Sequence, residues 1–154
     1  MINRSNREHL LHLLFWKQSE ADPTETLKED IDYYFSDFAS ILGETKTSSQ
    51  SIMSILQNIL ANIENIDEAI SKNLKKGWSI NRLNKAELAI LRLAAHEMLN
   101  EPEVPHSASI NEAVELTKNY SAEESAKFVN GILGGLLRSI KNKNDEGENA
   151  HKNL

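Results

Sequence analysis

The chain contains no cysteine, so it has no disulfide bond, no thiolate zinc site and no cysteine nucleophile. This composition fits a reducing cytosol. No stretch approaches the ~18 consecutive apolar residues that span a bilayer. The apolar run near the N-terminus covers only Leu13 to Trp16 and no small-residue cleavage site follows it, so a secretory signal is not expected. These absences predict a cytoplasmic protein that makes no contact with a membrane.

Motifs for catalysis and for metal binding are missing as well. There is no HExxH pair, and strand signals are almost absent, so no glycine loop follows a strand to cradle a phosphate. His9 and His12 are three residues apart on a predicted helix, but no third metal ligand is near them in sequence. We therefore expect two partly exposed histidines rather than a metal site. The sequence predicts no enzymatic activity, no cofactor and no bound metal.

Basic residues are in the minority. The chain has 17 lysines and arginines against 23 aspartates and glutamates, which gives a formal net charge of −6. Non-specific binding of nucleic acid relies on lysine and arginine displacing counterions, so an acidic protein is a poor candidate for it. Any RNA or DNA site must therefore be a local patch, which a partner can complete.

What the sequence does contain is helical periodicity. The chain has 154 residues, 40% of them hydrophobic, which is enough for one domain with its own core. Apolar residues recur every three to four positions, as in amphipathic helices. This pattern predicts an all-α protein of about seven helices, with residues 52–74 forming either one long helix or two that meet near Asn65. The predicted helices cover about residues 3–17, 23–41, 52–74, 84–99, 109–118 and 121–140.

Polar residues mark where several of these helices begin. A capping side chain accepts from free amides of the first turn, and a glutamate three residues later reaches back to the cap. Proline suits the first helical position. The predicted starts are Asp22 followed by Pro23, Asn84 with Glu87, Ser109 with Glu112, and Ser121 with Glu124.

Burial and packing can also be predicted from the pattern. Residues 88–95 are apolar nearly all round the helix, which indicates a central, buried helix. The lysines at 72, 75 and 76 suit the negative end of a helix dipole, and Trp78 is expected to cover the core. Gly131 and Gly135 lie inside a helical pattern and indicate that another helix approaches closely. From Asn142 onward no large apolar residue occurs before Leu154, so residues 142–154 are predicted to be a disordered tail.

A series of motifs runs without a gap through residues 83–133. It consists of a buried AILRLA-type helix, the Val104-Pro105 turn, INEAVELTK, an aromatic residue, a capped turn and KFVNG. In this order and spacing the motifs resemble the NusB family of bacterial transcription antitermination factors. The resemblance implies a single all-helical domain at 1–141, built as two three-helix bundles that share a long axis. The N-terminal bundle would cover about residues 1–77 and the C-terminal bundle about 78–141.

The resemblance also implies a function. Members of the family bind the boxA element of ribosomal RNA leader transcripts as a heterodimer with NusE, a small-subunit ribosomal protein. They act in the RNA polymerase antitermination complex and have no enzymatic activity. Cations suit phosphate, and an exposed aromatic ring can stack on an unpaired base, which is worth about 1–3 kcal/mol. By resemblance the RNA-binding residues are Arg4, Arg7, Lys127 and Phe128, and the NusE-binding residues are Phe15 and Glu87.

Each of these assignments has a structural alternative. The three cations would then be solvated surface charges, and Phe128 a core residue, although we expect its ring to be partly exposed. Asn111 and Asn130 are expected to be buried and to join two helices through backbone hydrogen bonds. The family's first helix usually carries a dense arginine cluster, whereas this chain has only Arg4 and Arg7. We therefore expect the isolated protein to bind RNA weakly.

Two other functions are compatible with the same fold. One is a protein-interaction module that has little RNA binding of its own. The other is the RNA-recognition domain attached to some RNA cytosine methyltransferases. That alternative is disfavoured by length, because no room for a catalytic domain remains after Ile140.

Overall fold

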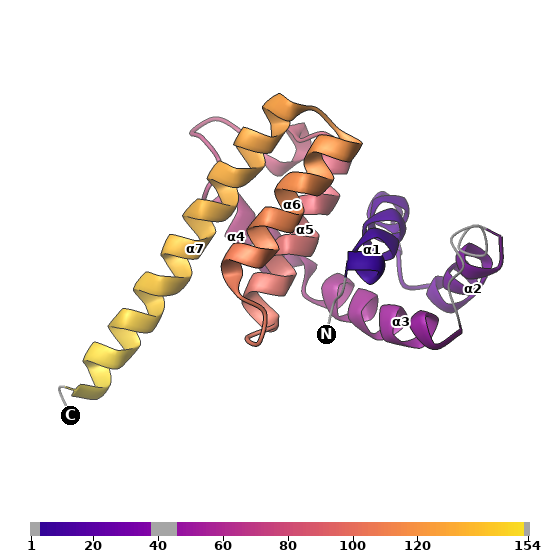
Figure 1. Cartoon of the computed structure of the whole chain (residues 1–154), viewed down its shortest axis with the longest axis horizontal. Helices are drawn as coiled ribbons and strands as arrows, with labels where there is room; N and C mark the ends of the chain where they lie inside the picture. The colour runs from indigo at the N-terminus through magenta and orange to yellow at the C-terminus, as the bar shows by residue number, and fades with distance from the viewer. Residues whose placement is uncertain (1–3, 38–45, 153–154) are drawn as a thin grey trace. The chain divides into compact units, whose positions relative to one another are not determined.

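The computed structural model describes residues 4–37 and 46–152, with side chains described for 6–37 and 49–145. The chain divides into two compact units, Met1–Ile63 and Glu64–Leu154, and each is described by itself (Figure 1). In the part that is described, the regular elements are seven α-helices and one short 3-10 helix. The prediction of an all-α protein with about seven helices is confirmed.

Unit 1 contains α1 (Arg4–Lys17), α2 (Leu27–Asp37) and α3 (Lys46–Ala61), and both α1 and α2 pack on α3 (Figure 1). Its core residues follow the three-to-four residue spacing of helices that bury one face. The fully buried aliphatic side chains include Leu10, Leu13, Leu14, Ile31, Ile52, Leu56 and Ile59.

The start of α2 differs from the prediction. The helix begins at Leu27, and residues before it form turns, in which the Glu25 amide donates to the Asp22 carbonyl at 3.4 Å. The Asp22 side chain accepts from Thr24 Oγ1 at 3.1 Å instead of capping a helix. The predicted cap at Asp22 is therefore wrong, because an aspartate can satisfy a turn as well as a helix end. The predicted last residues of this helix, 38–41, lie outside the described residues.

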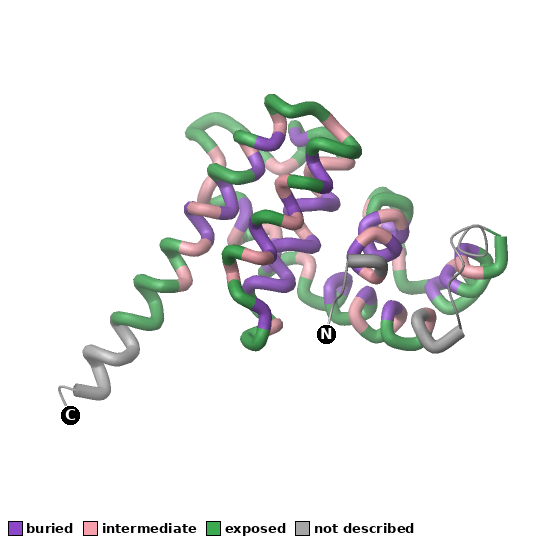
Figure 2. Tube along the Cα trace, in the orientation of Figure 1, coloured by how far each residue is buried: buried purple, intermediate pink, exposed green. Residues whose placement is uncertain are grey.

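Unit 2 contains α4 (Ile63–Ser71, whose first residue belongs to unit 1), the 3-10 helix η2 (Ile80–Arg82), α5 (Lys85–Asn100), α6 (His106–Tyr120) and α7 (Glu123–Lys152). Helices α5, α6 and α7 pack on one another in all three pairings (Figure 1). Residues 89–91 and 93–98 of α5 are all buried, and Figure 2 shows the helix buried along most of its length. The prediction of a central, buried helix is confirmed.

The long pattern at 52–74 forms two helices. They are separated at Asn62, three residues before the predicted junction. The Asn62 amide donates to the carbonyls of Asn58 and Ile59 at 3.1 and 3.2 Å, and its side-chain Nδ2 donates to the Asn58 carbonyl at 2.9 Å. An asparagine side chain competes with the backbone for hydrogen bonds in this way, which favours a break in the helix.

Of the three predicted caps in unit 2, the one at Asn84 is confirmed. Its Oδ1 accepts from the amides of Ala86 and Glu87 at 2.7 and 3.3 Å. Ser109 does not cap α6, because that helix already begins at His106, directly after Pro105. The Ser109 hydroxyl instead donates to the buried Glu97 carboxylate at 3.0 Å. The capping box at Ser109 is therefore wrong, since a buried carboxylate on another helix takes its hydroxyl.

Helix α7 continues to Lys152, whereas the sequence predicted no structure from Asn142 onward. Residues 141–145 are all exposed, and the second half of α7 extends beyond α5 and α6 (Figures 1 and 2). Adding a residue to an existing helix is much easier than starting one, and this segment contains no proline. Residues 141–145 therefore remain helical although they are exposed to solvent.

The two spaced glycines of α7 have different environments. A Cβ built on Gly135 would lie 2.9 Å from Asn73 Cγ and still closer to Asn73 Oδ1, whereas one built on Gly131 would meet nothing within 4 Å. The Asn73 side chain is held by a hydrogen bond from its Nδ2 to the Ala69 carbonyl at 3.1 Å. The predicted approach of another helix is therefore found at neither glycine: the neighbour of Gly135 is a side chain of the turn that follows α4, and Gly131 has no close neighbour.

This difference gives a paired prediction. We expect Gly135→Ala to lower the free energy of unfolding by about 1–3 kcal/mol, because the new methyl group overlaps the Asn73 side chain. Gly131→Ala should raise it by about 0.5–1 kcal/mol, because alanine favours an exposed helix and meets no neighbour. Urea unfolding followed by circular dichroism measures both. Equal effects of the two substitutions would contradict the contact at Gly135.

Candidate nucleic-acid interface

The first two RNA candidates lie on α1 in unit 1. Arg4 is the first residue of the helix, and its side chain lies outside the described residues. The Arg7 side chain is only 7% exposed and interacts with other groups of the protein. Arg7 is thus not a solvated surface charge, and its substitution would affect stability as well as any contact with RNA.

The histidines of α1 join it to α2. The Nδ1 atoms of His9 and His12 lie 2.8 and 2.9 Å from the Tyr34 hydroxyl. A hydroxyl has one proton, so Tyr34 can donate to one ring and must accept from the other. His9 is buried, which contradicts the expectation that both rings would be partly exposed, and His12 is half-buried. No group of three metal-ligating side chains occurs among the described residues.

This arrangement predicts lower stability in mild acid. Burial lowers the pKa of His12 below its ordinary value of 6.5, and His9 lowers it further, although Glu8 acts in the opposite direction. The unfolded chain therefore takes up the proton first, and stability is lost as the pH falls from 6.5 through the lowered pKa. We expect the free energy of unfolding in urea to fall between pH 7.5 and 5.5.

The variant His12→Gln isolates this effect. It should lose less stability than the wild type over the same pH interval. Burial also lowers the pKa of His96 in α5, so part of the pH dependence should persist in the variant. An unchanged pH dependence in His12→Gln would contradict the role given to His12.

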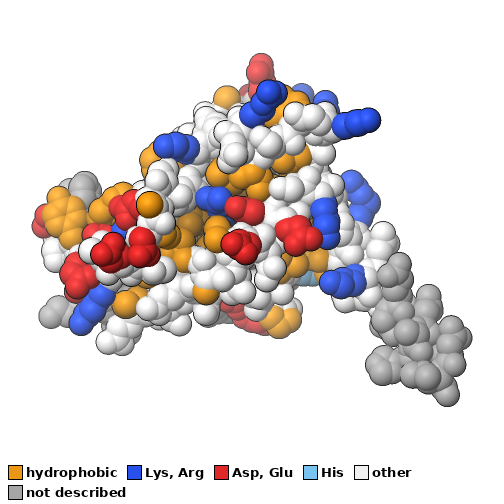
Figure 3. Space-filling view, turned by 180° about the vertical axis from the view of Figure 1, so that it is seen from behind, with side chains coloured by type: hydrophobic (Ala, Val, Ile, Leu, Met, Phe, Trp, Pro, Cys, Tyr) orange, Lys and Arg blue, Asp and Glu red, His pale blue; other side chains and the backbone are white. Residues whose placement is uncertain are grey.

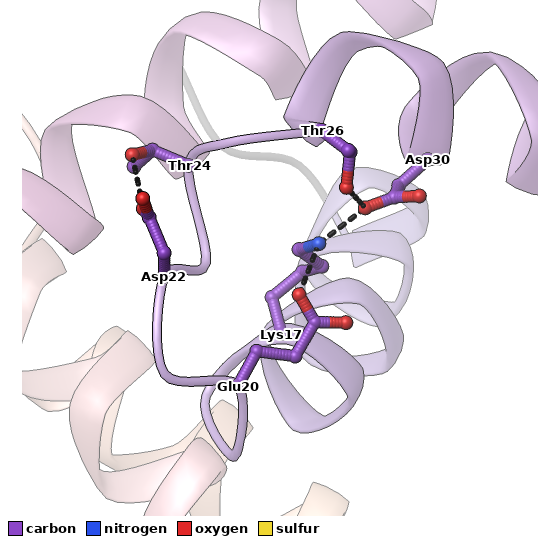
Figure 4. A network of polar contacts seen from close by, with 6 residues as sticks. All are labelled: Lys17, Glu20, Asp22, Thr24, Thr26 and Asp30. Atoms are coloured by element: carbon purple, nitrogen blue, oxygen red, sulfur yellow. Dashed lines mark hydrogen bonds and ion pairs between the residues drawn. The ribbon is translucent and has the colours of Figure 1, made fainter.

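A buried lysine holds the end of α1 against α2 (Figure 4). The Lys17 side chain is 0% exposed, and its Nζ donates to Glu20 Oε2 at 2.6 Å and to Asp30 Oδ2. Asp30 Oδ2 also accepts from Thr26 Oγ1 at 2.8 Å. Burial by itself would lower the pKa of Lys17, but the hydrogen bonds to Asp30 and Glu20 outweigh it and raise the pKa. Lys17 is therefore charged and fixes the chain on both sides of the turn.

Aromatic side chains are exposed next to this ion pair. Phe15, the first NusE candidate, is 47% exposed, and the neighbouring Trp16 is 38% exposed. Tyr33 of α2 is 53% exposed, and its ring centroid lies 6.4 Å from that of Trp16 in an edge-to-face arrangement. Exposed aromatic rings held on a rigid support are typical of protein interfaces.

The other two RNA candidates lie in the second turn of α7 in unit 2. Lys127 is exposed, and Phe128 is half-buried, as expected. The Phe128 ring packs beside Trp78, with centroids 6.4 Å apart and planes tilted by 48°. Asn111 and Asn130 are both exposed, so the prediction that they are buried and join two helices is wrong. Polar residues left over from an apolar pattern are more simply accommodated on the solvent face.

Glu87, the second NusE candidate, joins the start of α5 to the turn between α6 and α7. Its Oε1 accepts from Ser121 Oγ at 3.2 Å, and that hydroxyl lies 3.3 Å from Ser125 Oγ. The predicted cap at Ser121 is wrong, because α7 begins only at Glu123 and the Ser121 hydroxyl donates to Glu87 instead. A carboxylate has lone pairs for several donors, so its bond to Ser121 leaves Glu87 able to accept more.

The sequence is similar to that of known transcription antitermination proteins over most of its length. The model of the NusB family matches residues 4–138. The chain belongs to the NusB family. The transcription antitermination protein NusB of Clostridium botulinum (strain Alaska E43 / Type E3) is 42% identical over 139 residues, which cover 90% of this chain and 99% of that protein. The protein of the same name from Acetivibrio thermocellus is 36% identical over 150 residues, 97% of each chain.

Solved structures of NusB proteins have the same fold. NusB of T. maritima superposes with a TM-score of 0.71 at 33% identity, covering 90% of this chain and 92% of that one. A chain in the crystal structure of the antitermination factors NusB and NusE in complex with dsRNA gives a TM-score of 0.68 at 25% identity, covering 88% and 96%. Within the described residues, no helix has the length and apolar character needed to cross a membrane.

Proposed function

We propose that this protein is a transcription antitermination factor that binds boxA-type RNA of ribosomal RNA leader transcripts together with NusE. The observation that carries the proposal is the family match over residues 4–138, supported by the likeness to NusB in a complex with NusE and dsRNA. In this role the protein joins the RNA polymerase antitermination complex in the cytoplasm and catalyses no reaction.

We assign the RNA contacts to Arg4, Lys127 and Phe128, with Arg7 as a fourth residue whose burial also gives it a structural role. Cationic side chains suit phosphates, Lys127 is exposed, and the half-buried Phe128 ring offers a face for an unpaired base. Phe15 and Glu87 are assigned to NusE, because one presents an exposed ring and the other a carboxylate. The net charge of −6 opposes RNA binding by the isolated chain.

The expected result is that the protein alone binds boxA-type RNA weakly and that NusE raises its affinity by about tenfold or more. Fluorescence anisotropy of labelled RNA, titrated with the protein in the presence and absence of saturating NusE, measures this. NusE alone and an RNA with a scrambled boxA are the controls. If boxA-type RNA bound equally well, and without dependence on salt, in the presence and absence of NusE, the proposal would be overturned.

The second candidate is a NusB-fold protein-interaction module with little RNA binding of its own, and the burial of Arg7 favours it. The double variant Arg4→Ala/Lys127→Ala distinguishes the two, because it leaves the buried Arg7 intact. Loss of RNA affinity in the complex, with unchanged NusE binding, supports the RNA-binding factor. Full retention of RNA affinity supports the interaction module.

A further inference from the structure

The segment that connects α4 to α5 concentrates positive charge. Residues 72–85, here called the basic segment, contain five cations and no carboxylate, and the nearest acidic residues in sequence are Glu68 and Glu87. The chain as a whole has a net charge of −6. The cations of the basic segment are Lys72, Lys75, Lys76, Arg82 and Lys85. This is the local patch that an acidic protein needs in order to attract phosphates.

Trp78 lies in the middle of the basic segment and is 51% exposed. Gly77 before it has a φ of +89°, a conformation that favours glycine, and the Trp78 amide donates to the Lys75 carbonyl at 3.0 Å. The turn therefore presents the indole instead of burying it. The expectation that Trp78 covers the core is wrong, and the structure leaves half of a large aromatic side chain in water.

The exposed indole is continuous with the RNA candidate on α7. The Trp78 and Phe128 rings pack 6.4 Å apart, although they are 50 residues apart in sequence. Lys75, Lys76 and Lys127 beside them are exposed. Figure 3 shows Lys and Arg side chains and exposed hydrophobic side chains close together on the upper part of unit 2. Aromatic rings interleaved with cations are the usual surface for single-stranded nucleic acid.

The acidic residues near this surface limit where phosphates can bind. Glu123 and Glu124 lie in the first turn of α7, where their negative charge interacts favourably with the positive end of the helix dipole. They would repel a phosphate at that helix end. The cations that adjoin the two rings in sequence are Lys75, Lys76 and Lys127, whereas Lys72 at the start of the basic segment pairs with Glu68 at 3.4 Å.

We propose that Trp78 and the basic segment extend the RNA site beyond Phe128, with Trp78 stacking on an unpaired base and Lys75 and Lys76 holding the phosphates beside it. The inference rests on the proposed function, since it names a second contact for the same RNA. The aromatic pair commits the site to single-stranded RNA, because a paired base offers no free face for stacking.

The first test uses the full chain with saturating NusE and labelled boxA-type RNA. Trp78→Ala should weaken RNA binding about tenfold, and Trp78→Tyr should restore most of it, because a tyrosine ring also stacks. Lys75→Ala/Lys76→Ala should reduce the slope of log affinity against log salt by about 2. Lys141→Ala/Lys143→Ala removes the same charge from exposed positions of α7 and should leave the slope unchanged.

The second test reads the stacking directly. The chain has two tryptophans, Trp16 and Trp78, so Trp16→Phe leaves Trp78 as the only indole. RNA bound in the presence of tryptophan-free NusE should quench its fluorescence, and an RNA without unpaired bases should not.

The outcomes separate the two proposals. If wild-type protein with NusE binds RNA, but Trp78→Ala and the lysine variant bind equally well and Trp78 is not quenched, the inference fails and the proposed function stands. If wild-type protein with NusE does not bind boxA-type RNA, the proposed function fails and the inference with it. Binding that is weakened by Trp78→Ala, restored by Trp78→Tyr and accompanied by quenching supports both.

Discussion

Lys17→Met is expected to lower the free energy of unfolding by about 2–4 kcal/mol, because removing one partner of a buried ion pair leaves the other charge uncompensated. Lys17 is 0% exposed, whereas the side chains of Asp30 and Glu20 are 20% and 38% exposed. The remaining carboxylates can be partly hydrated, which keeps the effect below the largest values for such pairs. Urea unfolding at pH 7 measures it.

A matched control is available on α2. Lys28→Met makes the same substitution at an exposed lysine and should change the free energy of unfolding by less than about 0.5 kcal/mol. If Lys17→Met were as neutral as Lys28→Met, the buried pair would contribute nothing to stability. Methionine can replace the aliphatic part of the lysine, so the comparison isolates the charge.

The same pair has a defined pH window. Burial would raise the pKa of Asp30, but the hydrogen bonds from Lys17 and Thr26 outweigh it and lower the pKa below 3.8. The contribution of the Asp30 carboxylate to the free energy of unfolding is therefore complete above pH 3.8 and is lost as the pH falls through the lowered pKa. The raised pKa of Lys17 makes its contribution complete below 10.5 and lost as the pH rises through the raised value. Lys17→Met should remove the alkaline dependence and reduce the acid dependence, because the hydrogen bond from Thr26 to Asp30 remains.

Features set by neighbours in sequence could be predicted from the sequence. The buried helix α5 and its cap at Asn84 depend on a periodic apolar pattern and on amides two and three residues away. The serine caps failed because their hydroxyls have partners far along the chain, 12 residues away for Ser109 and 34 for Ser121. A local rule cannot anticipate a buried carboxylate that the fold brings near.

In the candidate site, too, some features could be predicted from the sequence and others depend on the fold. Lys127 and Phe128 were assigned by resemblance, and their exposure agrees with a binding role, which stays a prediction. Trp78 was missed because its neighbour Phe128 is 50 residues away and only the fold brings the rings together. A signal was nevertheless present in the sequence, since residues 72–85 hold five cations and no carboxylate. The charge pattern alone does not distinguish lysines that suit a helix end from lysines that bind phosphate.

The second large effect is expected at the proposed NusE surface. Phe15→Ala should weaken NusE binding about 10- to 30-fold, which corresponds to about 2 kcal/mol for truncating an aromatic residue at the centre of an interface. Phe15 is 47% exposed and lies two residues from the buried Lys17, so its ring is presented from a fixed helix end. Calorimetric titration of NusE into the protein measures the affinity.

Two further variants show whether the loss is specific. Leu99→Ala removes a similarly exposed large apolar side chain from α5 and should leave NusE binding within about threefold of the wild type. Glu87→Gln retains an oxygen that accepts from Ser121 but removes the charge, so it should weaken NusE binding mainly at low salt. At limiting NusE, the Phe15→Ala loss must reappear as weaker RNA binding, because in this proposal NusE completes the site. NusE affinity that is unaffected by Phe15→Ala would exclude this end of α1 as the docking surface.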